Sequence, residues 1–166
     1  DHGMGPTSNK KVVYLDRFID TSHFEVINGY NPNYLFLAKE GSYEKAWEGL
    51  SEVPHVSVWK HGEVPDRFHY GTHPRTLDFI LVANSSWSVG FSYDEHNYDG
   101  GAHGYDNDNT DMHAIFYAMG PDFKRGHIHP TFENVDLYPL ICELLELEPA
   151  ETDGRLERVR GMLNGE

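Results

Sequence analysis

Short apolar runs with the period of strands alternate along the chain with two stretches that have the period of helices. The strand-like runs lie at residues 10–16, 24–40, 55–60, 66–71 and 78–91. The run at 24–40 is interrupted by Asn-Gly-Tyr-Asn-Pro-Asn, a turn-forming sequence that predicts a hairpin-like pair of strands. A further mostly apolar run, residues 112–121, ends at Gly-Pro and is predicted to be a buried strand.

Helical spacing of apolar residues marks two segments, 41–52 and 133–149. The first carries Tyr43, Ala46, Trp47 and Leu50, with Ser42 in the N-cap position. The second carries Leu137, Ile141, Leu144 and Leu145. With Asp136 as its N-cap, Pro139 falls in the first turn, where its missing N–H has no intrahelical partner. Residues 151–166 are charged and weakly periodic, and are expected to form a surface helix or a fraying tail.

Strands mixed with a few helices predict an α/β fold. Residues 24–95 are expected to form a small β-rich (α+β) subregion in its middle. The chain shows no internal repeat, no low-complexity segment and no linker that would divide it cleanly. Its 166 residues are enough for one domain with a real core, or for a large piece of a bigger domain.

Composition narrows the possible functions. An apolar content of 39% and a charged content of 24% are typical of a globular protein. The net charge of −14 argues against binding long nucleic acids through a basic surface, although a bound metal could still attract a small phosphate ester. No apolar run approaches the roughly 20 residues that a membrane span needs. Cys142 is the single cysteine, so the chain forms no internal disulfide. A chain that starts at Asp1 is expected to be a mature or truncated piece.

The first candidate for chemistry is Asp1-His2-Gly3. Adjacent residues of a regular strand point to opposite faces, but a tight turn eased by Gly3 can bring both side chains to one side. Ligand sites of open α/β sheets lie at such strand ends. A carboxylate and an imidazole together suit zinc, so this segment is a candidate metal site.

The second candidate is His103, which stands between Ala102 and Gly104 in a glycine-rich loop. The glycines around it leave the ring uncrowded and allow the backbone to approach a site closely. The acids that follow, Asp106, Asp108 and Asp111, are an alternative calcium site, but they lack the central glycine and terminal glutamate of an EF-hand loop. An ordinary polar loop also remains possible at this point.

Nine of the eleven histidines lie outside these two motifs. His127 and His129 form an H-x-H pair that would share one side of a strand, but the flanking Gly126 and Pro130 favour a loop. The others have no matching partners and are expected to be structural; they include His96 and His113.

Together the two motifs resemble a known family. Residues 1–4 (DHGM), 66–89 (DRFHYGTHPRTLDFILVANSSWSV) and the HGYDN sequence of residues 103–107 follow one another as in the phosphodiesterase domain of the nucleotide pyrophosphatase/phosphodiesterase family. Residues 112–126 and 132–150 continue the similarity. That family belongs to the alkaline phosphatase superfamily. The resemblance implies that residues 1–166 are the carboxyl-terminal portion of such a domain, with a partial alkaline-phosphatase-like fold.

The resemblance also implies a mechanism with two zinc ions and a threonine nucleophile. Asp1 and His2 would bind the zinc that activates the nucleophile, and His103 would bind the other. The threonine, an early aspartate ligand and an aspartate-histidine pair belong to the family's amino-terminal half. None of the threonines of this chain lies in the motif of the nucleophile, so no catalytic residue is expected in it. Three ligands shared between two metals hold neither ion properly, and these 166 residues alone are expected to be inactive.

The implied substrate is a small phosphate ester, a phosphodiester or pyrophosphate of a nucleotide-like molecule. Phosphomonoester, phosphonate and lysophospholipid cleavage remain alternatives, because one metal core serves different leaving groups. A hypothesis of a different class is a stable but inactive fragment. The missing amino-terminal half is the expected partner, and the resemblance implies a periplasmic or secreted location.

Overall fold

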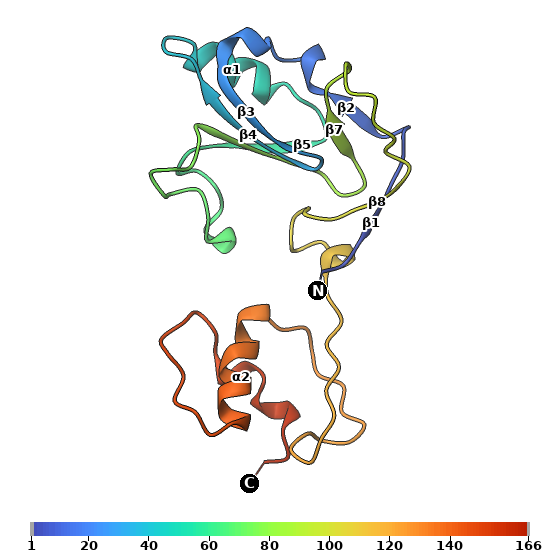
Figure 1. Cartoon of the computed structure of the whole chain (residues 1–166), viewed down its shortest axis with the longest axis vertical. Helices are drawn as coiled ribbons and strands as arrows, with labels where there is room; N and C mark the ends of the chain where they lie inside the picture. The colour runs from blue at the N-terminus through green and yellow to red at the C-terminus, as the bar shows by residue number, and fades with distance from the viewer. Residues whose placement is uncertain (1, 166) are drawn as a thin grey trace. The chain divides into compact units, whose positions relative to one another are not determined.

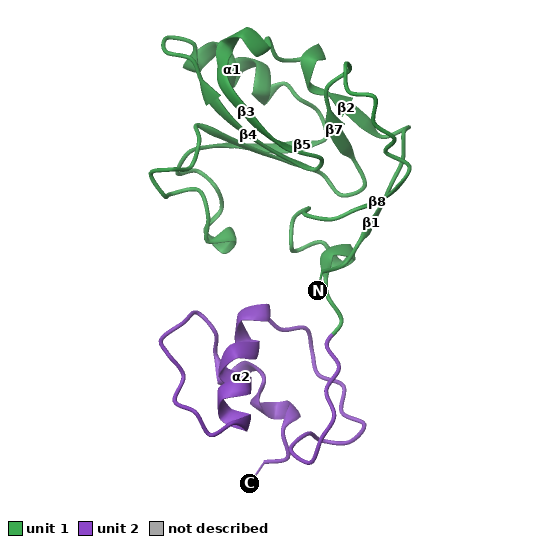
Figure 2. Cartoon of the chain, in the orientation of Figure 1, with its two compact units in different colours: residues 1–115 green, residues 116–166 purple. Residues whose placement is uncertain are grey.

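The computed structural model describes residues 2–165, so Asp1 and Glu166 lie outside the described part of the chain. Two compact units make up the structure, residues 1–115 and residues 116–166 (Figures 1 and 2). Each unit has its own apolar core.

The main sheet of the first unit has four antiparallel strands in the order β3-β4-β6-β5. Their bounds are β3 Phe24–Tyr30, β4 Asn33–Ala38, β5 Val56–Lys60 and β6 Phe79–Ala83. The predicted hairpin in residues 24–40 is confirmed: β3 and β4 pair up to Tyr30 and Asn33, around a turn at Asn31-Pro32.

Helix α1 (Tyr43–Ser51) covers this sheet (Figure 1). Tyr43 and Trp47 place their rings 4.8 and 5.9 Å from that of Phe79 in the central strand β6. Ala46 and Leu50, one and two turns along, are buried in the same core. The apolar stripe predicted for this helix is therefore the face that packs on the sheet.

Two small two-stranded sheets complete the first unit. Strand β2 (Val12–Tyr14) runs parallel to β7 (Ser88–Gly90), and β1 (Gly5–Thr7) runs antiparallel to β8 (Gly100–Ala102). The pairing of Gly5 with Ala102 places the amino-terminal motif next to the loop that begins at His103. Short 3-10 helices lie between the strands: η1 Leu15–Arg17, η2 Thr21–His23 and η3 Asp66–Phe68. A fourth, η4 (Thr110–Met112), follows β8.

The second unit is built around α2 (Leu137–Leu144), preceded by η5 (Asn134–Asp136) and followed by η6 (Leu156–Arg158) and η7 (Arg160–Met162). Its core is formed by Leu140, Val159, Met162 and Leu163. The expectation of a surface helix or fraying tail at residues 151–166 is therefore wrong, because η7 buries Met162 and the neighbouring Val159 and Leu163 are buried as well.

Asp136 occupies the N-cap position of α2, which places Pro139 in the first turn as predicted. Its fully buried carboxylate makes no capping bond and instead accepts from the backbone N–H of Arg155 at 2.8 Å. The predicted apolar stripe of α2 needs correction. The helix buries Pro139, Leu140 and Cys142, while Ile141 of the predicted stripe is 53% exposed. Most residues of this helix are apolar, so the spacing of apolar residues did not show which face would be buried.

Two predicted strands are absent from the described residues. Residues 66–71 instead form η3 and a loop in which His69 and Gly71 have positive φ angles of 48° and 101°. Residues 113–119 are irregular, with Ile115 and Tyr117 91% and 81% exposed. A strand needs a hydrogen-bonding neighbour, and residues 2–165 provide none beside this segment. In the same range no helix is long and apolar enough to span a bilayer.

Candidate metal site at His2 and His103

The structure brings His2 and His103 into direct contact. Their ring centroids lie 3.7 Å apart and their planes are inclined by 20°. Both residues are exposed. The contact follows from the β1–β8 pairing and from the Gly3 N–H, which donates to the carbonyl of Met112 at 3.0 Å. The prediction that the two motifs meet in space is confirmed for these two histidines.

The glycine that follows each histidine has a steric role. A Cβ on Gly3 would lie 2.0 Å from the carbonyl oxygen of Asp111, a distance that no side chain tolerates. Gly104 has a φ of +91°, and a Cβ there would lie 3.0 Å from the side-chain nitrogen of Asn33. Both histidine segments therefore need glycine to approach their neighbours.

Three contacts with distant segments of the chain hold the loop after His103 in place. The Asn33 amide of the β3–β4 hairpin donates to the carbonyl of Gly104 at 2.8 Å. The buried Tyr105 donates its hydroxyl hydrogen to the carbonyl of Trp87 at 2.9 Å. Arg67 of η3 forms an ion pair with the carboxylate of Asp106. The position of His103 is thus determined by residues far from it in sequence.

Two of the three acids of this loop, Asp106 and Asp108, are engaged by Arg67. Arg67 reaches Asp106 and lies 3.2 Å from a carboxylate oxygen of Asp108. Asp106 also accepts from the backbone N–H of Asp108 at 2.9 Å, which closes a local turn. The hydrogen bond from Arg67 is the main reason that the pKa of Asp106 is lowered. Carboxylates committed to a guanidinium do not form the open oxygen cage that calcium requires, which argues against a calcium site here.

The tautomer of His2 suits a metal ligand. Its Nδ1 lies 2.8 Å from the carbonyl oxygen of Gly3. Because a carbonyl only accepts, a hydrogen bond between these two atoms requires the proton to be on Nδ1. Histidine ligands commonly donate one N–H to a backbone carbonyl in this way while the other nitrogen binds the metal.

The described residues do not complete a metal shell. Within residues 2–165 no three His, Cys, Asp or Glu side chains converge closely enough to hold an ion. A zinc ion in a catalytic site takes three protein ligands, so two imidazoles are an incomplete set. Asp1, the predicted carboxylate ligand, lies outside the described residues.

Three of the other histidines lie against neighbouring rings. His127 and His129 contact each other edge to face, with centroids 5.7 Å apart, and His129 lies against Phe132. No third ligand joins them among the described residues. His96 packs on Tyr98 with ring centroids 4.7 Å apart.

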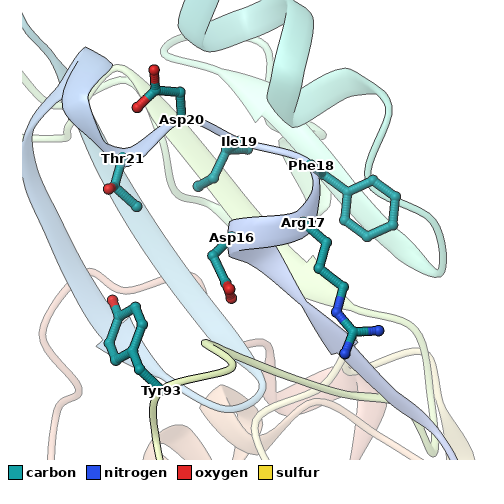
Figure 3. Close-up of a pocket in the computed structure, with 7 residues that line it drawn as sticks. All are labelled: Asp16, Arg17, Phe18, Ile19, Asp20, Thr21 and Tyr93. Carbon is teal, nitrogen blue, oxygen red and sulfur yellow. The ribbon is translucent and has the colours of Figure 1, made fainter.

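A depression of about 460 Å³ lies elsewhere in the first unit (Figure 3). Its wall contains neither predicted histidine and is formed by Asp16, Arg17, Phe18, Ile19, Asp20, Thr21 and Tyr93. The Asp16 carboxylate accepts from the backbone N–H of Ser92 at 2.7 Å and from the hydroxyl of the same residue. This acid therefore serves to join two loops, and the depression is not the candidate site.

Comparison with solved structures defines the class of fold. The chain superposes on human ectonucleotide pyrophosphatase/phosphodiesterase 5 with a TM-score of 0.92 and 34% sequence identity, over 99% of this chain and 44% of that one. The murine protein of the same name gives 0.91 and 33%. The predicted α/β fold, part of an alkaline-phosphatase-like fold, is thereby confirmed.

The sequence profile of the type I phosphodiesterase / nucleotide pyrophosphatase family matches residues 1–106. The chain belongs to this family, as its motifs predicted. It is 34% identical over 165 residues to human ectonucleotide pyrophosphatase/phosphodiesterase family member 5, covering 99% of this chain and 34% of that protein. It is 33% identical over 163 residues to human bis(5'-adenosyl)-triphosphatase ENPP4, covering 98% and 35%. The chain therefore spans about a third of the length of the curated relatives it matches.

Sequence reasoning did not find the residues that hold the His103 loop. Arg67 lay in a run predicted as a strand, and Asn33 in a turn, so neither position suggested a contact with this loop. Their sequence separations from it, 39 and 71 residues, leave no local pattern that could have revealed them.

Proposed function

We propose that the chain is the carboxyl-terminal part of a zinc-dependent hydrolase that cleaves phosphodiester or pyrophosphate bonds of nucleotide-like substrates. His2 and Asp1 bind one zinc ion and His103 the other. The nucleophile is a threonine outside this chain. The observation that carries the proposal is the ring contact of His2 with His103, which joins the two family motifs at one exposed place.

The chain's own residues hold the ligands in position. A hydrogen bond from Nδ1 of His2 to the Gly3 carbonyl would orient the ring and make Nε2 the nitrogen that binds the metal. The bonds of Asn33 to Gly104 and of Tyr105 to Trp87 set the backbone on which His103 stands. Ligands that are already in place bind a metal without the cost of ordering them, which is how outer contacts raise metal affinity.

Zinc supplies two effects when bound: it lowers the pKa of the attacking hydroxyl and stabilises the charge on the attacking and leaving oxygens. His2 and His103 contribute by binding in the neutral form. Protonated imidazoles cannot bind zinc, and two of them in contact would also repel each other.

Support for the substrate class comes from the relatives. The matched human proteins are named nucleotide pyrophosphatase/phosphodiesterase and bis(5'-adenosyl)-triphosphatase, and both names describe cleavage of phosphate esters or anhydrides of nucleotides. The acidic surface, with a net charge of −14, disfavours long polyanions and favours a small substrate drawn in by the metal. The prefix "ecto" in the relative's name supports an extracytoplasmic location.

The test uses the full-length protein that contains this chain. Its metal content is measured by mass spectrometry, and hydrolysis of a chromogenic nucleotide phosphodiester is followed with and without a chelator. We expect zinc, and loss of activity on chelation that added zinc restores. A panel with a phosphomonoester, a phosphonate and a lysophospholipid decides among the alternative substrates. A full-length protein that binds no zinc and hydrolyses none of them would support the inactive alternative.

A further inference from the structure

Arg67 makes the most extensive side-chain contact with the segment that follows His103. Its Nη1 donates to Oδ1 of Asp106 at 2.7 Å, and its Nη2 donates to Oδ2 of the same carboxylate. Nη1 also donates to the side-chain oxygen of Asn107 at 3.1 Å and lies 3.2 Å from the carboxylate of Asp108. One guanidinium thus holds three consecutive residues of the loop.

The guanidinium is itself held in place. It lies over the ring of Phe68, with 4.0 Å between Cζ and the ring centroid. Phe68 in turn packs against Trp59 of β5, with ring centroids 5.7 Å apart. A planar, two-pronged cation stacked on an aromatic ring fixes both the distance and the orientation of its carboxylate partner. Arg67 therefore links the loop, through Phe68, to Trp59 of the four-stranded sheet.

The charges of the cluster are consistent with a persistent pair. The hydrogen bond to Asp106 raises the pKa of Arg67, and the same bond lowers the pKa of Asp106. Both groups stay ionised across the neutral range. Asp108 adds a second negative charge, so one cation balances two acids within a strongly acidic protein.

We infer that Arg67 is a positioning residue, which fixes the loop of residues 103–108 so that the His103 ring stays in place beside His2. The inference rests on the proposed function, since the value of a fixed His103 is its role as a zinc ligand. The Gly104 and Tyr105 contacts hold the first half of the loop, and Arg67 holds the second half. Without Arg67 the carboxylates of Asp106 and Asp108, on either side of Asn107, would lose the cation that they share.

The test compares Arg67→Met, Arg67→Lys and Arg75→Met in the full-length protein. Arg75 is an exposed arginine of the same 61–76 segment and serves as the matched control. We expect Arg67→Met to weaken zinc binding about 10- to 100-fold, the usual effect of losing an outer contact of a metal ligand. The zinc affinity of Arg67→Lys should lie between those of Arg67→Met and the wild type. Lysine keeps the positive charge but lacks the two-pronged guanidinium that binds both carboxylate oxygens. Arg75→Met should match the wild type.

Three further measurements separate positioning from other roles. At saturating zinc the kcat of Arg67→Met should return to within a few-fold of the wild type, because the ligand is displaced and not removed. In metal-free protein, amide hydrogen exchange in residues 103–108 should be faster in Arg67→Met and unchanged in Arg75→Met. Asp106→Asn combined with Arg67→Met should cost little more zinc affinity than Arg67→Met alone.

Unchanged zinc affinity in Arg67→Met, or an equal loss in Arg75→Met, would overturn the inference. A kcat that stays low at saturating zinc would also overturn it, since it would make Arg67 a substrate contact. A wild-type protein without zinc would refute the proposed function, whereas the exchange measurement would still report whether Arg67 orders the loop.

Discussion

A Cβ on Gly3 would lie only 2.0 Å from the carbonyl oxygen of Asp111. Gly3 also donates its N–H to the carbonyl of Met112. The amino-terminal motif is therefore seated against the end of the His103 segment by a contact that only glycine permits. This relationship predicts that a change in one motif disturbs the other, although the two are remote in sequence.

Gly3→Ala is expected to unseat the motif, because the new methyl group would overlap backbone atoms that cannot rotate away. In the full-length protein, zinc affinity should fall at least 10-fold, measured by competition with a chelating dye. Gly165→Ala is the control, since a Cβ there would meet no atom within 4 Å. Wild-type zinc affinity in Gly3→Ala would show that the contact does not support the site.

Replacing either histidine of the site should abolish most of the activity. In the full-length protein, His2→Ala and His103→Ala are each expected to lower zinc-dependent hydrolysis of a nucleotide phosphodiester by orders of magnitude, because each removes a metal ligand. His96→Ala and His113→Ala should change the rate little: His96 packs on Tyr98, and the side chain of His113 is exposed. Equal losses in all four variants would argue against a site at His2 and His103.

The isolated 166-residue chain is expected to show no turnover with the same substrate. No three possible ligands converge within residues 2–165, and none of the threonines of the chain lies in the motif of the nucleophile. The assay is run at high protein concentration with added zinc, and with the full-length protein as the positive control. Chelator-sensitive hydrolysis by the isolated chain would reveal a nucleophile among these residues.

The ion pair of Arg67 with Asp106 predicts a pH dependence of stability. The hydrogen bond from Arg67 lowers the folded-state pKa of Asp106 below the ordinary 3.8. The stabilisation is therefore complete above that value and is lost as the pH falls through the folded-state pKa. Thermal unfolding from pH 7 to 2 should show wild type more stable than Asp106→Asn at neutral pH, with the difference shrinking below pH of about 4. A difference that persists at the lowest pH would contradict this assignment.

Phe79→Ala should strongly destabilise the first unit. Phe79 is fully buried in the central strand β6, against Tyr43 and Trp47 of α1. Truncation of a buried phenylalanine costs about 3–5 kcal/mol, and urea unfolding of the full-length protein measures it. Tyr30→Ala is the control, because its ring is 78% exposed. Similar unfolding midpoints for the two variants would contradict the packing described.

The secondary structure that depends on local pattern was predictable. The hairpin at 24–40 was predicted because two strand-like apolar runs flank a turn-forming sequence. The helix over residues 41–52 was predicted because its apolar residues recur with the period of a helix. Residues 112–121 have an equally strand-like composition, yet they form no strand. The composition of a segment indicates whether it could be buried. A strand forms only where a neighbouring strand pairs with its backbone N–H and C=O groups.

By itself the sequence determined the family, through two motifs that each place a histidine before a glycine, and it singled out these histidines as the proposed metal ligands. Only the tertiary structure decided what holds them. Arg67, Asn33 and Tyr105 reach the His103 loop through contacts between distant segments, and such contacts depend on how the sheets place their connecting loops. A local pattern records the period of one element and the turn at its end. It does not record which remote side chain will face it after folding.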